Sequence, residues 1–271
     1  MSNGGQLAGK GALVTGAAGA IGRAISRCFL AEGAGLVLVD NHRDRLSQFA
    51  SELSSQFASS SFRTVEADVR DTKAVREACA IALEAFGRLD ILVNNAAVTQ
   101  IKTIDALDDD DIDLIIDTNL KGYIKFTRET VRIMKEQKSK GCLLFISSKN
   151  GLVGASEKSL YNASKGGEIN LARGLAKELG AFGIRVNTIC PDAVLEGSAL
   201  WERGGGYLEG TAKRYGIGID EIPQFYRKRC ALETEIKPQD VANAALFLVS
   251  DRAAKMTGNI ITVDGGVAYV R

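Results

Sequence analysis

Short apolar runs rich in β-branched residues alternate along the chain with longer segments in which apolar residues recur every three or four positions. The short runs predict seven strands, at Ala12–Thr15, Gly35–Val39, Arg63–Ala67, Ile91–Val93, Leu143–Ile146, Ile184–Ile189 and Ile260–Val263. The longer segments predict six helices, at Ile21–Glu32, Arg43–Phe57, Thr72–Phe86, Asp113–Lys135, Ser159–Leu179 and Pro238–Val249. Because apolar strands separated by helices are typical of a parallel sheet covered on both faces, the pattern predicts an α/β fold with a doubly wound, seven-stranded parallel sheet.

One segment, at about residues 192–236, interrupts this alternation within what we expect to be a single domain over residues 1–271. Long connections in compact α/β domains are usually functional or disordered. The aromatic residues of this segment argue against disorder, and they are Trp201, Tyr207, Tyr215 and Tyr226. We therefore interpret the segment, called the lid below, as a partly helical cover over a substrate.

Composition excludes several kinds of partner. A formal net charge of +1 gives no reason to expect nucleic acid or a charged membrane surface. No run of about 18 apolar residues predicts a membrane span, and Met1–Lys10 has no apolar core typical of a signal peptide. We expect a cytoplasmic protein.

The cysteine and histidine content argues against a metal site. The five cysteines lie far apart and show no Cys-x-x-Cys spacing, so neither a disulfide framework nor a zinc site is predicted. His42 is the only histidine, which excludes a multi-histidine metal site, and its place after a strand predicts a loop residue. No metal is expected.

The sequence TGAAGAIG at residues 15–22 joins the first strand to the first helix. Glycines let the chain turn tightly and let a phosphate approach the backbone, while a helix N-terminus offers free N–H groups and the positive end of a dipole. The motif predicts a Rossmann-like site for a dinucleotide pyrophosphate. The alternative, a tight turn without a ligand, stays open on this motif alone.

Asp40 ends the second strand, about 20 residues beyond the turn. A carboxylate there can accept both ribose hydroxyls of the adenosine half and repels a 2′-phosphate, which predicts NAD rather than NADP. His42 and Arg43 lie near enough in the sequence to weaken this preference. The alternative is that Asp40 caps the helix that follows.

Tyr161 and Lys165 are four residues apart at the start of a predicted helix, so their side chains share a face. A phenol titrates near 10, and an adjacent ammonium can lower that pKa by about one to three units. The pair could therefore exchange a proton with a substrate alcohol. Spacing alone also fits an ordinary surface pair.

Several motifs occur together in one order. They are TGAAGAIG at residues 15–22, NNAA at residues 94–97, Asn119 within Thr-Asn-Leu, Ser148, and YNASK at residues 161–165. In this combination the chain resembles the short-chain dehydrogenase/reductase family over residues 10–266. The resemblance implies an oxidoreductase that transfers hydride to or from a nicotinamide cofactor.

The resemblance also implies roles for individual residues. Tyr161 is expected to be the general acid and base, and Lys165 to lower its pKa and hold the nicotinamide ribose. Ser148, thirteen residues before Tyr161, is expected to hydrogen-bond the reacting oxygen, with Ser147 as the adjacent rival, and Asn119 to support a relay water. Expected cofactor contacts are Gly16, Gly19, Ala20, Ile21, Gly22, Asp40, Asp68, Val69, Asn94, Ala96, Tyr161, Lys165, Pro191, Ala193 and Val194.

The chain departs from the family pattern at three positions. Ala20 and Ala97 replace glycines, and both are small enough to leave cofactor binding intact. Pro191-Asp192 replaces the common Pro-Gly where substrate and nicotinamide meet, which brings a carboxylate near the substrate. Its alternative role is to cap the first helix of the lid.

Lys149, Asn150 and Asp192 are the predicted substrate residues. The stretches around them resemble sugar- and polyol-linked members of the family, the sorbitol-6-phosphate dehydrogenases and the dehydrogenase half of bifunctional rhamnulose-phosphate aldolase/dehydrogenases. Lys149 follows Ser148 at the strand edge where open α/β sheets bind ligands, which favours an anionic group on the substrate. The lid adds further cations, Arg203, Lys213, Arg214, Arg227, Lys228 and Arg229.

These observations predict NAD-dependent interconversion of a secondary alcohol and a carbonyl on a polyol, a sugar or an anionic sugar derivative such as a phosphate or sulfonate. The alternatives are a hydroxyaldehyde dehydrogenase, a ketoacyl- or steroid-type reductase, and a catalytically idle NAD-binding regulator. The resemblance also implies a homo-oligomer, a tetramer or dimer, that associates through the helices predicted at Asp113–Lys135 and Ser159–Leu179.

Overall fold

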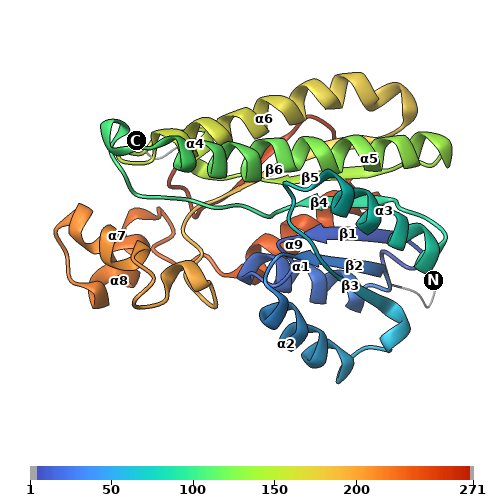
Figure 1. Ribbon diagram of the computed structural model, residues 1–271, viewed down its shortest axis with the longest axis horizontal. Helices are drawn as coiled ribbons and strands as arrows, with labels where there is room; N and C mark the ends of the chain where they lie inside the picture. The colour runs from blue at the N-terminus through green and yellow to red at the C-terminus, as the bar shows by residue number, and fades with distance from the viewer. Residues whose placement is uncertain (1–4, 269–271) are drawn as a thin grey trace.

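The computed structural model describes residues 5–268; the extreme ends of the predicted domain, and with them part of Met1–Lys10, lie outside the described residues. Its seven parallel strands form one sheet in the order β3-β2-β1-β4-β5-β6-β7 (Figure 1). The strands are β1 (Gly11–Thr15), β2 (Gly35–Asp40), β3 (Phe62–Glu66), β4 (Ile91–Asn94), β5 (Cys142–Ile146), β6 (Arg185–Pro191) and β7 (Ile260–Val263). The predicted doubly wound parallel sheet is confirmed.

Helices cover both faces of the sheet because alternate strand residues point to opposite sides. In β1, Ala12 and Val14 pack in the core between the sheet and α1, α2 and α9, whereas Leu13 packs in the core between the sheet and α3, α5 and α6 (Figure 1). The helices are α1 (Ala20–Ala31), α2 (Arg43–Ser54), α3 (Thr72–Phe86), α4 (Asp109–Ile115), α5 (Gly122–Glu136), α6 (Ser159–Leu179), α7 (Tyr207–Tyr215), α8 (Ile222–Arg229) and α9 (Pro238–Val249). Short 3₁₀ segments lie at Ser59–Ser61, Ile104–Ala106, Lys149–Gly151, Gly180–Phe182, Ala199–Trp201, Ile219–Glu221 and Asp251–Ala253.

The helix predicted at Asp113–Lys135 differs from the structure in two ways. It begins earlier, as α4 at Asp109, because Asp108 and Asp111 form a capping box and acidic residues favour a helix N-terminus. It is also interrupted by a π-helical turn, η3 (Ile116–Lys121), before α5. Apolar periodicity shows neither a cap nor a change of winding, so the sequence pattern missed both.

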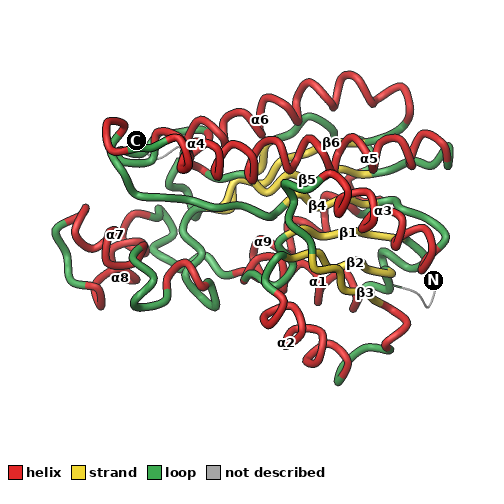
Figure 2. Tube along the Cα trace, in the orientation of Figure 1, coloured by secondary structure: helices red, strands yellow, loops and turns green. Residues whose placement is uncertain are grey.

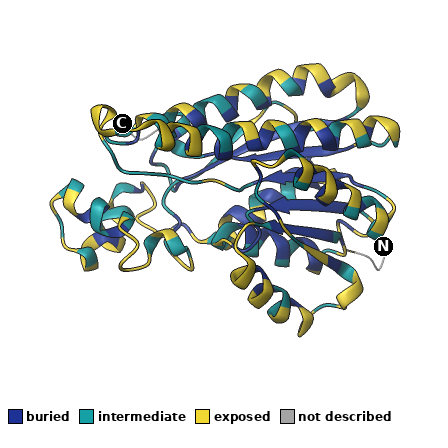
Figure 3. Cartoon of the chain, in the orientation of Figure 1, coloured by how far each residue is buried: buried dark blue, intermediate teal, exposed yellow. Residues whose placement is uncertain are grey.

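The lid lies beside the end of β6 rather than over a face of the sheet (Figure 2). Its helices α7 and α8 pack on a small apolar cluster of their own, centred on Leu208, Ala212 and Ile222. The two ends of the lid are joined by a parallel bridge between Val194 and Ile236. Figure 3 shows the contrast between the buried strands and the more exposed lid helices.

No helix within residues 5–268 is both long and apolar enough to cross a membrane.

Candidate active site

A cavity of about 610 Å³ opens at the C-terminal ends of the strands, next to the glycine-rich turn. Gly16 has a φ of 62°, and a Cβ there would lie 2.9 Å from the Ala96 Cα. A Cβ on Gly22 would lie 2.1 Å from the Gly16 carbonyl oxygen. Glycine is therefore required at both positions to hold the turn against β4 and the start of α1. No side chain within the described residues caps the N-terminus of α1, and Gly19, Ala20 and Ile21 at this end of the helix line the cavity.

Asp40 holds the turn to the end of β2. Its carboxylate accepts hydrogen bonds from the Ala18 amide at 2.9 Å and the His42 amide at 3.0 Å, and it lines the cavity. The residue that caps α2 is His42, whose Nδ1 accepts from the Arg45 amide. The alternative interpretation of Asp40 as the helix cap is therefore wrong.

Most of the predicted cofactor residues gather around this cavity. Those that line it are Gly16, Gly19, Ala20, Ile21, Asp40, Asp68, Val69, Ala96, Tyr161 and Val194. Gly22 instead packs α1 against the turn, and the Asn94 amide donates to Thr127 Oγ1 inside the protein. Pro191 and Ala193 line an adjoining cavity, and Lys165 is buried behind both.

Asp68 is held by Arg70, whose guanidinium donates to both carboxylate oxygens at 2.7–3.1 Å. These hydrogen bonds lower the pKa of Asp68 below its usual value. Arg70 lines the same cavity, as do His42 and Arg45, so two guanidinium groups share the cavity with the carboxylates of Asp40 and Asp68. Sequence reasoning did not single out Arg45 or Arg70.

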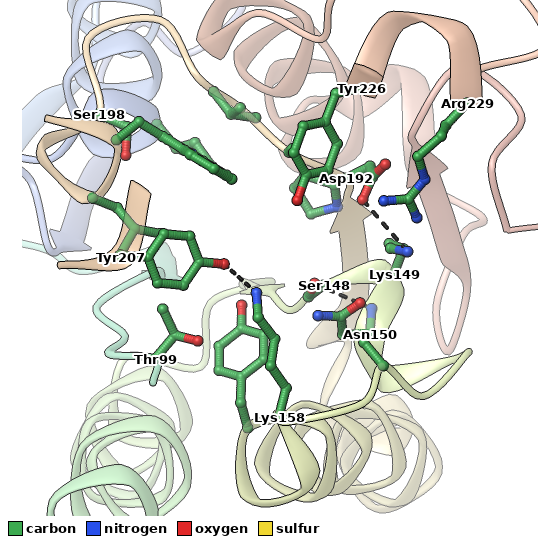
Figure 4. A pocket seen from close by; sticks show the side chains of 18 of the residues that line it. Thr99, Ser148, Lys149, Asn150, Lys158, Asp192, Ser198, Tyr207, Tyr226 and Arg229 are labelled. Carbon is green, nitrogen blue, oxygen red and sulfur yellow. Dashed lines mark hydrogen bonds and ion pairs between the residues drawn. The ribbon is translucent and has the colours of Figure 1, made fainter. Parts of the chain in front are cut away.

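The adjoining cavity, of about 180 Å³, is lined by Ser148, Tyr161 and the predicted substrate residues (Figure 4). Ser148 caps the 3₁₀ segment η4 (Lys149–Gly151), and its Oγ accepts from the Asn150 amide at 3.1 Å. Ser147 turns inward instead, and its hydroxyl donates to the Lys165 carbonyl oxygen at 2.8 Å. Both serines line the cavity, but Ser147 is buried and its hydroxyl proton is used by the Lys165 carbonyl oxygen, whereas Ser148 is partly exposed.

Tyr161 is partly buried on the first turn of α6, and desolvation raises the pKa of its phenol. The positive charge of Lys165 and a hydrogen bond with Ser148 act in the opposite direction. Desolvation has the largest effect, so the pKa of Tyr161 is raised, and the net lowering of this pKa expected from the sequence is not found. Lys165 does act in the expected direction, because its charge lowers the pKa of Tyr161, but this effect is smaller than that of desolvation.

Lys165 forms a buried ion pair that sequence reasoning missed. Its ammonium donates to Glu168 at 2.8 and 3.1 Å and to the Ile146 carbonyl oxygen at 3.1 Å, and both residues are almost fully buried. Burial raises the pKa of the Glu168 carboxyl to about 7. The spacing of three residues places Glu168 and Lys165 on one face of α6, a signal that was available in the sequence.

Asn119 lies in the π-helical turn η3, behind the cavities. Its side chain accepts from the Val98 amide at 2.8 Å and donates to the Val98 carbonyl oxygen at 2.9 Å and to Ser164 Oγ at 3.0 Å. Asn119 lines neither cavity. Its bonds instead tie α6 to the segment after β4, and π-helical turns are frequent at functional sites.

The three predicted substrate residues line the smaller cavity together. The Lys149 ammonium lies 3.7 Å from the Asp192 carboxylate, and both side chains are largely buried. Asn150 Oδ1 is buried and has no hydrogen-bond partner among the described residues. The lid helices begin elsewhere, at Tyr207 and Ile222, so Asp192 does not cap one of them.

Further charged and aromatic residues line this cavity. Lys158, just before α6, donates a hydrogen bond to the Tyr207 hydroxyl and was not singled out from the sequence (Figure 4). Of the six lid cations, Arg214 and Arg229 reach the cavity, whereas the other four are exposed. Trp201 stacks edge-on against Tyr207 at 5.0 Å and Tyr226 at 5.4 Å. Only the place of Lys158, three residues before Tyr161, could have indicated its role.

Known proteins resemble the chain along nearly its whole length. A family model described as enoyl-(acyl carrier protein) reductase matches residues 16–268. Uncharacterized oxidoreductase YuxG of Bacillus subtilis (strain 168) is 40% identical over 95% of this chain, which spans 37% of that relative. A 7alpha-hydroxysteroid dehydrogenase of Bacteroides fragilis is 32% identical, with 94% of this chain and 93% of the relative covered.

Sorbitol-6-phosphate 2-dehydrogenase of Escherichia coli (strain K12) is 31% identical over 94% of this chain and 97% of the relative. A solved structure assigned to the short-chain alcohol dehydrogenases, from Sinorhizobium meliloti 1021, is 30% identical and superposes with a TM-score of 0.83 over 96% of this chain and 97% of its own. Taken with the sheet order, the glycine-rich turn and the Tyr161–Lys165 site, these likenesses place the chain in the short-chain dehydrogenase/reductase family, as an enzyme of the oxidoreductase class.

Proposed function

We propose that this enzyme uses NAD to interconvert a secondary alcohol and a carbonyl on a polyol, a sugar or an anionic sugar derivative. The observation that carries the proposal is the position of Tyr161. Its side chain lines both the large cavity beside Asp40 and the small polar cavity beside Ser148. A group that can move a proton thus stands where a dinucleotide and a small alcohol would meet.

The positions of the site residues support a separate role for each of them in the reaction. Tyr161 takes the proton of the alcohol, and the Ser148 hydroxyl holds the reacting oxygen. The charge of Lys165 favours the phenolate, while Asn119 keeps α6 in register with the segment after β4. NAD, when bound, supplies the hydride acceptor.

The glycine-rich turn and Asp40 fit the dinucleotide. Gly16 and Gly22 leave no room for a Cβ, while a Cβ on Gly19 would meet nothing closer than 3.5 Å and faces the cavity. The Asp40 carboxylate lies at the end of β2, where it favours ribose hydroxyls over a 2′-phosphate. We therefore propose NAD as the preferred cofactor, although His42, Arg45 and Arg70 line the same cavity.

The small cavity favours a polar substrate. Its volume of about 180 Å³ is below the range of about 300–1,000 Å³ that drug-sized ligands occupy. Lys149 and Asp192 place opposite charges on its wall, which the polar residue Asn150 also lines. These groups suit hydroxyls better than an acyl chain or a steroid, because buried polar groups must find partners. A hydroxyaldehyde fits the same cavity and is the second candidate substrate.

The test is NAD reduction measured with a panel of polyols, aldoses, hydroxyaldehydes and their phosphates and sulfonates, alongside a hydroxysteroid and a hydroxyacyl thioester. We expect turnover of polar alcohols, loss of about 10²–10⁴-fold in kcat for Tyr161→Phe, and unchanged NADH binding by fluorescence titration. Efficient turnover of only the steroid or thioester would reverse the substrate assignment. NADH binding without turnover of any compound, in both proteins, would favour an idle regulator.

We also propose a homo-oligomer and a cytoplasmic location. Ile112, Leu114 and Ile124, on α4 and α5, are large apolar residues that are more than 40% exposed, as an interface through these helices requires. Ile124→Glu should reduce the mass measured by light scattering. The five cysteines are free thiols, which suits a reducing compartment.

A further inference from the structure

The smaller cavity carries an excess of positive charge. Four cationic side chains line it, with a single carboxylate, that of Asp192. The cations come from separate elements of the fold, which are η4, the residue before α6, α7 and α8, and they are Lys149, Lys158, Arg214 and Arg229. Figure 4 labels Lys149, Lys158 and Arg229. Such convergence of like charges costs free energy in a protein without its ligand.

Two of these cations have partners that disperse their charge. Lys149 lies 3.7 Å from the Asp192 carboxylate. Arg229 sits over the rings of Tyr226 at 5.2 Å and Phe225 at 5.5 Å, where the ring faces attract it. These contacts hold both side chains in place.

Arg214 is held in place by its neighbours, but one of its N–H groups lacks a hydrogen-bond acceptor among the described residues. Its guanidinium donates to Ser156 Oγ at 3.2 Å and lies over the Tyr215 ring at 4.9 Å. The Glu157 carboxylate is 3.6 Å from its Nε, which leaves that buried nitrogen without a hydrogen bond. A planar guanidinium held in this way presents donors to an oxyanion.

Lys158 is the most unusual of the four. It is 6% exposed, and its hydrogen bond is to a neutral phenol, the Tyr207 hydroxyl. Burial and the charges of Arg214, Lys149 and Arg229 lower the pKa of Lys158 to about 7, and Asp192 opposes this only in part. Buried groups with strongly shifted pKa values are typical of functional sites.

The position of Lys158 limits the size of its ligand. Its Nζ lies 5.9 Å from the centre of the Tyr161 ring and 4.5 Å from that of Tyr207. An anion held by Lys158 would therefore lie within a few bonds of the carbon that reacts at Tyr161. The cavity volume of about 180 Å³ sets the same limit.

We propose that Lys158 and Arg214 form a subsite for a tetrahedral oxyanion, a phosphate or sulfonate, carried on a short hydroxylated chain. The subsite rests on the proposed function and adds the substrate's charged end to it. Lys149, Asn150 and Asp192, which line the same cavity, then receive the hydroxyls. Binding of the anion converts Lys158 to its ammonium form, so the protein takes up a proton with the ligand above neutral pH.

The probes are glycerol, glycerate, glycerol 3-phosphate and 2,3-dihydroxypropane-1-sulfonate, which share one carbon skeleton and differ in the charged group. Isothermal titration at pH 8, in two buffers of different ionisation enthalpy and with and without saturating NADH, measures affinity and proton uptake. We expect the phosphate or the sulfonate to bind at least tenfold more tightly than glycerol, with net uptake of a proton. Glycerate tests whether a planar carboxylate binds the subsite as tightly as a tetrahedral oxyanion does.

The variants are Lys158→Met and Arg214→Met, with Lys213→Met as the control because Lys213 is exposed on the same helix, α7. Lys158→Met should remove both the preference for the anion and the proton uptake, and Arg214→Met should weaken the anion tenfold or more. Lys213→Met should match the wild type. The proposal fails if the preference survives Lys158→Met, or if Lys213→Met lowers it equally.

Turnover separates this subsite from the proposed function. Tight anion binding with proton uptake, but no NAD reduction on any probe, retains the subsite and refutes the oxidation. NAD reduction on neutral polyols without any preference for anions retains the oxidation and refutes the subsite. Because Arg214→Met tests the same subsite independently, the proposal stays falsifiable if Lys158→Met does not fold.

Discussion

Glu168→Gln tests how the buried carboxylate acts on the proton-transfer group. The change is nearly isosteric and keeps an acceptor for the Lys165 ammonium, which now bonds Glu168 at 2.8 and 3.1 Å. It removes a negative charge that raises the pKa of Tyr161. Without that charge the phenolate forms more readily, so the pKa of Tyr161 should fall.

The size of the effect follows from distance. The Lys165 ammonium lies 5.7 Å from the centre of the Tyr161 ring, and a unit charge at that distance, in an effective dielectric constant near 20, contributes about 3 kcal/mol, or about two pKa units. Glu168 stands behind the ammonium and cancels part of this contribution. Its removal should therefore lower the pKa of Tyr161 by about one unit.

The assay is the pH dependence of kcat/KM for alcohol oxidation. Activity requires the phenolate, so the rising limb of the profile should move about one unit toward lower pH in Glu168→Gln. Glu129→Gln is the matched control, because Glu129 is a largely buried carboxylate paired with Arg128 and Arg132 on α5, away from the cavities. A limb that stays in place, or moves to higher pH because Lys165 loses its proton, refutes the reasoning.

Three further predictions concern the turn, the cofactor and Lys158. Gly16→Ala adds a Cβ contact at 2.9 Å to the strain of a positive φ. The control is Gly87→Ala, where φ is also positive but a Cβ meets nothing within 4 Å, and its free energy of unfolding should fall by about 1–2 kcal/mol. Urea denaturation should show a larger loss of unfolding free energy for Gly16→Ala. Asp40→Ala should lower the preference of kcat/KM for NAD over NADP by about 10–100-fold, while Asp44→Ala, exposed on α2, should not change it. The pKa of Lys158 is lower in the folded protein, about 7, than in the unfolded chain. Lys158→Met should therefore raise the melting temperature at pH 7, and this gain should shrink as the pH rises toward 10. An equal gain in melting temperature at both pH values would contradict this.

The sheet was the part of the fold that sequence patterns predicted best. All seven strands lie within two residues of their predicted bounds. The central strands β1, β4 and β5 are buried along their whole length, and such strands are near-continuous apolar runs. The π-helical turn around Asn119 could not be predicted, since it changes the winding of a helix without altering its apolar face. Predicted bounds also missed the start of α4, where capping by Asp108 is local and polar.

In the site, sequence motifs indicated which residues lie at the cavities, but not how burial and neighbouring charges set the pKa values of these residues. Tyr161, Ser148 and Asp40 lie at cavities, as the motifs indicated. The net pKa of Tyr161 depends on burial, which only the folded chain defines. Two of the three cationic neighbours of Lys158, Arg214 and Arg229, belong to the lid and approach Lys158 only in the folded chain, so no local spacing reveals the cluster.

The bridge between Val194 and Ile236 brings the two ends of the lid to one point at the edge of the sheet. The segment between them is thus an interchangeable module: a lid of different length or sequence can be grafted there without changing the separation of the flanking elements. Substrate range and hydride chemistry are then separable engineering targets, apart from the substrate-cavity residues that lie outside this segment, Lys149, Asn150, Lys158 and Asp192. Exchange of residues 194–236 between relatives should transfer substrate preference while leaving cofactor preference with the recipient.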